Sequence, residues 1–290
     1  MKNLFVILSI LFLFIGCSDK EKERITVVTN SWIGYAPLFY AKEKNYLKDL
    51  NIKLVTAVSL GEASEIYSVG KADMVTTTQH EYYALKQMFK TLVPVILLDR
   101  SNGGDMILSN KTIEELRKSD KIYVYLEVDS INREMIEIFT NINHIDEKKF
   151  VFINGDQAQL QSENYDLSKP IILATYTPYN NFYLKRGFHE IASTGDLDDI
   201  VIIDALCTTK EFLNRNISRL EKFKKIIDQS IAEIEGDKKG SYKLIKRYLN
   251  DISYSEYLDS LKSIKWINNP EKELLDKIDK LGYKKEYIIQ

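Results

Sequence analysis

Short runs rich in β-branched and aromatic residues alternate along most of this chain with segments of helical period. This alternation is typical of α/β proteins, in which helices cover a sheet whose strands run mainly parallel. Strands are predicted at residues 25–30, 52–57, 73–77, 92–98, 105–109, 121–126, 149–154, 171–176 and 200–206. Helices are expected to begin near Pro37, Glu62, Gln79, Ile113, Asn132, Asp156 and Tyr179.

The pattern changes after Cys207. No further strand is predicted there, and residues 210–283 have the apolar spacing of a run of amphipathic helices. A chain of 290 residues is also near the upper limit for a single hydrophobic core. The sequence therefore predicts two compact α/β lobes with a helical C-terminal cap.

The N-terminal residues have the layout of a secretory signal peptide. Lys2 precedes an apolar run from Leu4 to Gly16, which is shorter than the roughly 20 residues that span a bilayer. The run ends in Phe14-Ile15-Gly16-Cys17, which resembles the bacterial lipobox and implies cleavage before Cys17 and acylation of its thiol. We therefore expect a signal peptide at 1–16, a charged tether at 17–24, and an exported, lipid-anchored protein that faces the periplasm or the cell exterior. A plain signal peptide that happens to contain a cysteine is the alternative.

Composition and motifs argue against several functions. Lys and Arg total 40 against 42 Asp and Glu, and the charges are spread along the chain, so no nucleic-acid partner is expected. The three histidines lie far apart without a cysteine partner, so no metal site is predicted. The glycine-bearing stretches lack the spacing of phosphate-binding loops, and no nucleophile elbow is present. We expect no cofactor and no enzymatic activity.

Polar and aromatic residues follow several predicted strands, at the edge where open α/β sheets place their ligands. After strand 25–30, a turn allowed by Gly34 would present Trp32 and Tyr35 to a ligand, although both rings would also suit the core between the lobes. Thr76 and Thr77 lead into a helix whose free N–H groups suit a carboxylate or sulfonate. The competing role for one of the threonines in this run is that of a helix cap.

Further candidates lie around the predicted passage into the second lobe. Ser101 and Asn102 precede a double glycine and Asp105, an arrangement that lets backbone approach a ligand closely, but that also fits an ordinary turn. Ser130 begins a predicted helix, either as its cap or as a ligand donor. Tyr176 and Tyr179 follow the strand at 171–176 and offer stacking surface for a ring.

In order and spacing, these segments are similar to the solute-binding proteins of ABC importers in the nitrate, sulfonate, taurine and pyrimidine-precursor group. The segments that carry the resemblance are WIGYAPLFYAKEKNYLKDLNIKLV, VGKADMVTTT, LLDRSNGGDMILSNKTIEELR and TPYNNFYLKRGF. The resemblance implies a type 2 periplasmic-binding-protein fold, with lobe one at 25–104 plus 205–290 and lobe two at 105–204. It also implies a monomer that binds a small molecule between its lobes and delivers it to an ABC permease and its ATPase.

The ligand itself is left open by the sequence. The resemblance implies a sulfonate, a pyrimidine or thiamine precursor, or a related heterocycle. Asp105, Glu127 and Asp204 are predicted near the cleft, where they would favour an amine or a nitrogen heterocycle, unless they are hinge or capping residues that face away. Two other functions are compatible with the pattern: a binding module that serves a membrane sensor, and an enzyme of the pyrimidine-precursor synthase type, which would need a histidine in its cleft.

Overall fold

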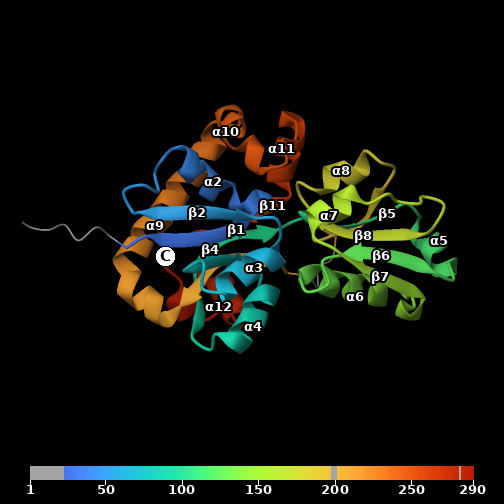
Figure 1. Cartoon of the computed structure of the whole chain (residues 1–290), viewed down its shortest axis with the longest axis horizontal. Helices are drawn as coiled ribbons and strands as arrows, with labels where there is room; N and C mark the ends of the chain where they lie inside the picture. The colour runs from blue at the N-terminus through green and yellow to red at the C-terminus, as the bar shows by residue number, and fades with distance from the viewer. Residues whose placement is uncertain (1–22, 197–200, 281) are drawn as a thin grey trace, which may run out of the picture.

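The computed structural model describes residues 23–196, 201–280 and 282–290, which form two lobes lying end to end (Figure 1). Each lobe has its own sheet with helices packed on it, so the predicted two-lobed α/β architecture is confirmed. The predicted signal peptide and the predicted acylation site, Cys17, lie outside the described residues. No helix within the three described ranges is long and apolar enough to cross a membrane.

Lobe one is built on a six-stranded sheet with the order β11-β4-β10-β3-β1-β2. Its strands are β1 (Ile25–Asn30), β2 (Ile52–Ala57), β3 (Met74–Thr77), β4 (Leu92–Ser101), β10 (Ile203–Thr209) and β11 (Ile264–Trp266). β3 is buried along its whole length and β4 along all but one residue, because helices cover both faces of the sheet. Burial on both faces explains why these strands have continuous apolar runs instead of alternating ones.

Lobe two is built on a five-stranded sheet with the order β7-β6-β8-β5-β9. Its strands are β5 (Asp105–Ser109), β6 (Ile122–Leu126), β7 (Phe150–Asn154), β8 (Ile171–Tyr176) and β9 (His189–Ser193). The central strands β5 and β8 are fully buried, whereas the edge strand β7 is partly exposed.

Both sheets are mixed, whereas the sequence predicted mainly parallel ones. β1 pairs in parallel with β2 and β3, and β6 with β7 and β8. The strands nearest the crossings differ: β10 is antiparallel to β3 and β4, and β5 is antiparallel to β8 and β9. The reason is that the chain leaves lobe one along β4 and returns to it along β10, so the two strands run in opposite directions.

Helices cover both sheets. In lobe one they are α2 (Ala36–Glu43), α3 (Leu60–Ser68), α4 (Gln79–Met88), α9 (Lys210–Gly236), α10 (Lys238–Ile245), α11 (Tyr254–Lys262) and α12 (Lys272–Lys280), with short 3-10 turns η2 (Ile33–Tyr35), η4 (Lys246–Tyr248) and η5 (Lys285–Tyr287). In lobe two they are α5 (Ile113–Lys118), α6 (Ile131–Asn143), α7 (Gln157–Ser162) and α8 (Asn180–Leu184), with η3 (Glu147–Lys149). The seven helices for which a start was predicted, α2 to α8, begin within two residues of it.

Two short strands were absent from the prediction. β9 lies at the edge of the sheet of lobe two, and β11 lies at the edge of the sheet of lobe one, where Ile264 is paired with Ser101 and Trp266 with Asp99. The expectation that no strand follows Cys207 is therefore wrong. β11 has three residues, too few for a period of two to be recognised, and it is a strand because β4 extends far enough to pair with it.

The two crossings between the lobes are joined by hydrogen bonds. The Ser101 amide donates to the Ile202 carbonyl at 3.0 Å, which links the outgoing segment to the returning one. The Asn102 amide donates to the Ser263 carbonyl at 2.9 Å, which ties the outgoing segment to the end of α11. These bonds hold the passage between the lobes against the C-terminal cap.

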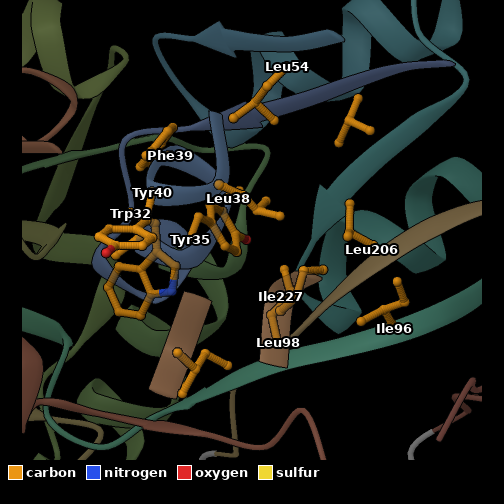
Figure 2. Close-up of a cluster of buried hydrophobic side chains, with 14 of the residues drawn as sticks. Trp32, Tyr35, Leu38, Phe39, Tyr40, Leu54, Ile96, Leu98, Leu206 and Ile227 are labelled. Carbon is orange, nitrogen blue, oxygen red and sulfur yellow. The ribbon is translucent and has the colours of Figure 1, made fainter. Parts of the chain in front are cut away.

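The main hydrophobic core of lobe one lies between its sheet and helices α2 and α9 (Figure 2). Leu38 and Phe39 from α2 pack there with Ile96 from β4 and Ile227 from α9. The same cluster continues through Trp32 to Tyr176 and Tyr179 of lobe two. Apolar packing therefore runs across the boundary between the lobes, which lie in a closed arrangement.

Candidate functional site

A small enclosed cavity lies where the two lobes meet. Its volume is about 10 Å³, which is room for about one water molecule. Both lobes and the returning strand β10 contribute its lining residues, which are Asn30, Trp32, Tyr35, Leu60, Thr78, Asp105, Tyr176 and Asp204. The cavity sits at the carboxyl ends of β1, β3 and β8, the place at which open α/β sheets bind ligands.

The turn after β1 places two aromatic residues against buried carboxyl groups. The indole Nε1 of Trp32 donates to Asp99 Oδ1 at 2.9 Å, and the hydroxyl of Tyr35 donates to Asp204 Oδ1. Gly34 allows this arrangement, because a Cβ atom there would lie 2.1 Å from Asp99 Oδ2. The chain then enters α2, where Pro37 occupies an early helical position.

Lobe two contributes a tyrosine that reaches both lobes. The hydroxyl of Tyr176 donates to Glu127 Oε1 at 3.3 Å and accepts a hydrogen bond from Asn30 Nδ2 at 3.2 Å. The Tyr176 ring meets Trp32 edge to face, with centroids 6.0 Å apart, and Tyr179 in the same way at 5.3 Å. Tyr179 also donates to the Val58 carbonyl at 3.4 Å. These aromatic contacts close the cavity from the side of lobe two.

Four buried carboxyl groups lie at the cavity or next to it: Asp105 and Asp204 line it, whereas Asp99 and Glu127 accept hydrogen bonds from the lining residues Trp32 and Tyr176. Burial is the largest cause of the raised pKa in each case: it raises the pKa of Asp105 to about 7 and the pKa values of Asp99 and Glu127 to about 8. The pKa of Asp204 is raised well above its ordinary value, by burial and then by the negative charge of Asp99. Within the described residues, none of the four forms an ion pair.

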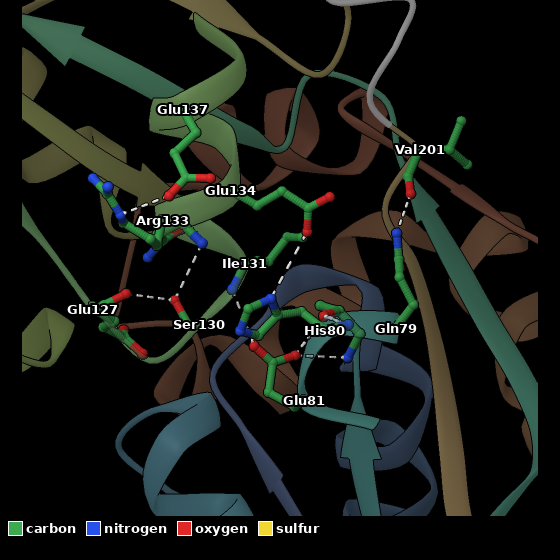
Figure 3. A network of polar contacts seen from close by, with 12 residues as sticks. Gln79, His80, Glu81, Glu127, Ser130, Ile131, Arg133, Glu134, Glu137 and Val201 are labelled. Carbon is green, nitrogen blue, oxygen red and sulfur yellow. Dashed lines mark hydrogen bonds and ion pairs between the residues drawn. The ribbon is translucent and has the colours of Figure 1, made fainter. Parts of the chain in front are cut away.

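A fifth buried carboxylate, Glu81, joins the lobes (Figure 3). Its Oε2 accepts the Thr78 amide at 3.0 Å, which completes a capping box at the start of α4 in lobe one. Its Oε1 accepts the Ile131 amide at 3.2 Å, at the start of α6 in lobe two. A neighbouring contact joins His80 to Glu134 at 3.8 Å, and the Glu134 hydrogen bond and charge contribute to a raised pKa of the histidine. The N-terminus of α6 therefore faces a carboxylate supplied by the other lobe.

A wider groove leads outward from Glu81 and Glu127. We call it the outer groove; its volume is about 510 Å³, and its walls come from α3 and α4 on one side and from the loops after β6 and β7 on the other. Six acidic residues line it, namely Glu62, Glu65, Glu81, Glu127, Asp129 and Asp156. No Lys, Arg or His is among its described lining residues.

The structure brings four of the predicted site residues to the cavity: Trp32, Tyr35, Asp105 and Tyr176. The ring of Tyr179 packs edge to face against that of Tyr176. The remaining residues lie elsewhere. Thr76 donates to the Thr29 hydroxyl at 3.0 Å inside lobe one, and the Thr77 hydroxyl lies 3.3 Å from Cys207 Sγ.

Three further predicted residues have positions at helix ends or at the crossing. The Ser101 hydroxyl pairs with that of Thr194 at 2.7 Å and accepts the Asp105 amide at 3.0 Å, so it braces the two crossing segments. Asn102 is exposed. Ser130 is the N-cap of α6, where it accepts the Asn132 amide at 3.2 Å.

Asn30, Leu60, Thr78, Glu81 and Asp99 were not among the predicted site residues. Asp99 had the clearest available signal, because a carboxylate inside the apolar run of β4 must be buried and must find a donor. Asn30 had a weaker signal, as the polar last residue of β1 directly before the aromatic turn.

The described residues hold no group of three or more His, Cys, Asp or Glu side chains arranged to bind a metal ion. His144 and His189 are exposed, and His80 lies on the rim of a different groove, between α4 and α6. No histidine in the described chain lines the cavity.

No model of a known protein family matches the sequence, and no curated protein matches it. Solved structures do resemble the chain. A ligand-binding component of an ABC-type import system from Staphylococcus aureus, solved with zinc bound, is 15% identical with a TM-score of 0.71, over 90% of this chain and 91% of that one. The alkanesulfonate-binding protein of Xanthomonas axonopodis pv. citri, bound to MOPS, is 12% identical with a TM-score of 0.71, over 92% and 94%.

A third similar structure is a protein from Candida albicans described as having the generic periplasmic binding protein fold. It is 13% identical with a TM-score of 0.63, over 84% of this chain and 81% of that one. The likeness spans both lobes in all three comparisons. The chain therefore has the periplasmic-binding-protein fold, and a ligand-binding component of an ABC-type import system is among the solved structures that share it.

Proposed function

We propose that this protein is the solute-binding receptor of an ABC importer, which captures a small organic molecule between its lobes and delivers it to a membrane permease. The observation that carries the proposal is the buried cavity, whose polar and aromatic walls come from both lobes. Such a site exists only when the lobes are closed, so ligand binding and closure are coupled. Two similar solved structures support the same function: one is named as the ligand-binding component of an ABC-type import system, and the other as an alkanesulfonate-binding protein.

We propose further that the protein is exported and held at the membrane by lipid on Cys17. A tether confines the receptor near its permease and raises its effective concentration there. By this proposal the chain carries out no covalent chemistry, in keeping with binding proteins as its structural neighbours.

Crosslinking in living cells tests the receptor function without knowledge of the ligand. The full-length chain is crosslinked in its native host, and the membrane proteins attached to it are identified by mass spectrometry. We expect a polytopic ABC permease among them. Recovery of a histidine kinase or a cyclase, without a permease, would instead assign the protein to sensing.

Fractionation tests the tether separately. Cys17→Ser should move the protein from the membrane fraction to the soluble exported fraction. Cys207→Ala is the matched control, because it removes the other cysteine of the chain, which is buried in β10, and should leave the protein membrane-bound. If the Cys17→Ser protein stays with the membrane, lipid on Cys17 is not its anchor.

A further inference from the structure

The charged side chains described at the interlobe site are all acidic. Asp105 and Asp204 line the cavity, and the neighbouring outer groove has six acidic lining residues and no basic one among those described. Asp99 lies directly behind Trp32, without an ion-pair partner in the described chain. An anion entering this region would meet acidic groups and no basic one among the described residues, whereas a bound cation would favour the ionised form of Asp105 and Asp204 and be attracted by it.

The hydrogen-bond donors of the cavity are already in use. Trp32 and Tyr35 donate to Asp99 and Asp204. In the same way, Tyr176 donates to Glu127, and the Thr78 hydroxyl donates to Glu81. A bound sulfonate or nitrate needs donors from the protein, and these side chains would have to release a carboxylate to supply them.

Acceptors, in contrast, remain free. Asn30 is fully buried and its Oδ1 has no partner; Asp105 is 5% exposed and its Oδ2 has none either. Both side chains line the cavity. A buried acceptor without a donor is costly, so these two oxygens point to a ligand that brings N–H groups.

The helix N-terminus that would suit an anion is filled as well. The Ile131 amide at the start of α6 donates to Glu81 Oε1 from the other lobe, and the Asn132 amide donates to Ser130. The protein's own carboxylate thus occupies the position that an anionic ligand would take at a helix N-terminus.

We propose that the interlobe site binds an organic cation, a protonated amine or amidinium, through Asp105, Asp204 and Asn30. The lobes must part to admit it, because the closed cavity has room for only about one water molecule. Trp32 and Tyr176 supply aromatic faces at the same place, which attract a cation by their ring quadrupoles. This inference rests on the proposed receptor function and specifies its ligand class. Binding would supply both the missing donors and the missing positive charge.

Probes that share a hydrocarbon part and carry opposite charge test the ligand class. The melting temperature of the mature chain is compared between benzamidinium and benzenesulfonate, and between butylammonium and butane-1-sulfonate. It is also measured with a small-molecule extract of the host that ion exchange has separated into cationic, anionic and neutral fractions. A ligand at 100 times its dissociation constant raises the melting temperature of a protein this size by roughly 5 to 10 °C. We expect a rise of this size with the cationic fraction. Within each probe pair, we expect a smaller rise in melting temperature with the cationic member.

Variants locate the site. Asp105→Asn should require about 10- to 150-fold more of the cationic fraction for the same rise, because a charge-assisted hydrogen bond is lost. Asp120→Asn is the matched control, since Asp120 is an exposed residue of lobe two that lies just before β6, and it should behave as wild type. A rise with an anionic or neutral fraction, or no rise with any fraction, overturns the cation proposal. The receptor function is judged separately, by whether crosslinking recovers a permease.

Discussion

Gly34 lies against the buried carboxyl group of Asp99 and cannot accommodate a side chain. A Cβ atom there would come within 2.1 Å of Asp99 Oδ2, and that carboxyl is held by Trp32 and fully buried, so it has no space to move away. We predict that Gly34→Ala lowers the free energy of unfolding by about 1 to 3 kcal/mol, the usual cost of overpacking. Urea denaturation of wild type and variant measures the change.

Gly61 offers the same substitution without the clash. It lies in α3, and the nearest atom to its Cβ position is Ser59 Oγ at 3.7 Å. Gly61→Ala should therefore raise the free energy of unfolding by up to about 1 kcal/mol, because alanine is the better helix former. Equal effects of the two substitutions would show that the Asp99 contact does not constrain position 34.

Single residues were predictable where the chemistry of a loop was visible in the sequence. Trp32, Tyr35 and Tyr176 were predicted as ligand residues because aromatic residues at the ends of strands suit a ligand site, and the structure places all three at the interlobe cavity. Within the threonine run the candidates were Thr76 and Thr77, which belong to the buried strand β3, whereas Thr78 leaves the strand and lines the cavity. Asp99 was missed because its apolar neighbours indicated core, and its partner Trp32 is 67 residues away in sequence.

At the scale of elements, the contact of Glu81 between α4 and α6 favours the closed arrangement. Its charge faces the positive end of the α6 dipole, an interaction that contributes about 0.3 to 1 kcal/mol at exposed sites and up to about 2 kcal/mol when partly buried. Glu81→Gln keeps the capping box of α4, since glutamine also caps, but removes the charge. We predict a shift toward the open form, measured as a larger interlobe distance by fluorescence energy transfer between labels on the two lobes.

Glu115→Gln provides the matched control. Glu115 completes the capping box of α5 with Thr112, entirely within lobe two and exposed to solvent. The same change of charge there should leave the interlobe distance unchanged. If Glu81→Gln and wild type give the same distance while both are folded, the contact with Ile131 does not stabilise closure.

Elements were predictable when they were long and had a clear period. The long strands and the helix starts followed directly from apolar spacing and capping residues. The edge strands β9 and β11 were not recognised, because a short strand is defined by the neighbour it pairs with more than by its own pattern. The direction of the strands could not be predicted from the sequence either, because parallel and antiparallel pairing depend on where the chain crosses between the lobes.

At the scale of the whole molecule, the closed arrangement concentrates buried acids between the lobes. Carboxyl groups that are far apart in sequence meet there, and each carries a raised pKa: about 7 for Asp105 and about 8 for Asp99 and Glu127. The sequence contained these acids, but only the packing of one lobe on the other shows that they are buried in one region, without ion-pair partners among the described residues. That property makes the stability of the unliganded protein depend on pH.

The direction of this dependence follows from the raised pKa values. Unfolded carboxyl groups release their protons near pH 4, whereas the folded protein keeps them on Asp105, Asp99 and Glu127 until about pH 7 to 8. The folded state therefore binds more protons between these limits. The stabilising contribution of each group is complete below about pH 4 and is lost as the pH rises through 7 to 8, by at most about 1.4 kcal/mol per pH unit.

Urea denaturation of the unliganded protein at pH 5.5 and pH 7.5 measures this loss. We expect the free energy of unfolding to be lower at pH 7.5 by about 2 kcal/mol or more, since one fully shifted group alone gives about that value over two pH units. Asp105→Asn should reduce the difference, because an amide cannot titrate, and Asp120→Asn at the exposed control position should not. Stability that is flat or rises between the two pH values would mean that water reaches the acids and that the lobes of the unliganded protein are open in solution.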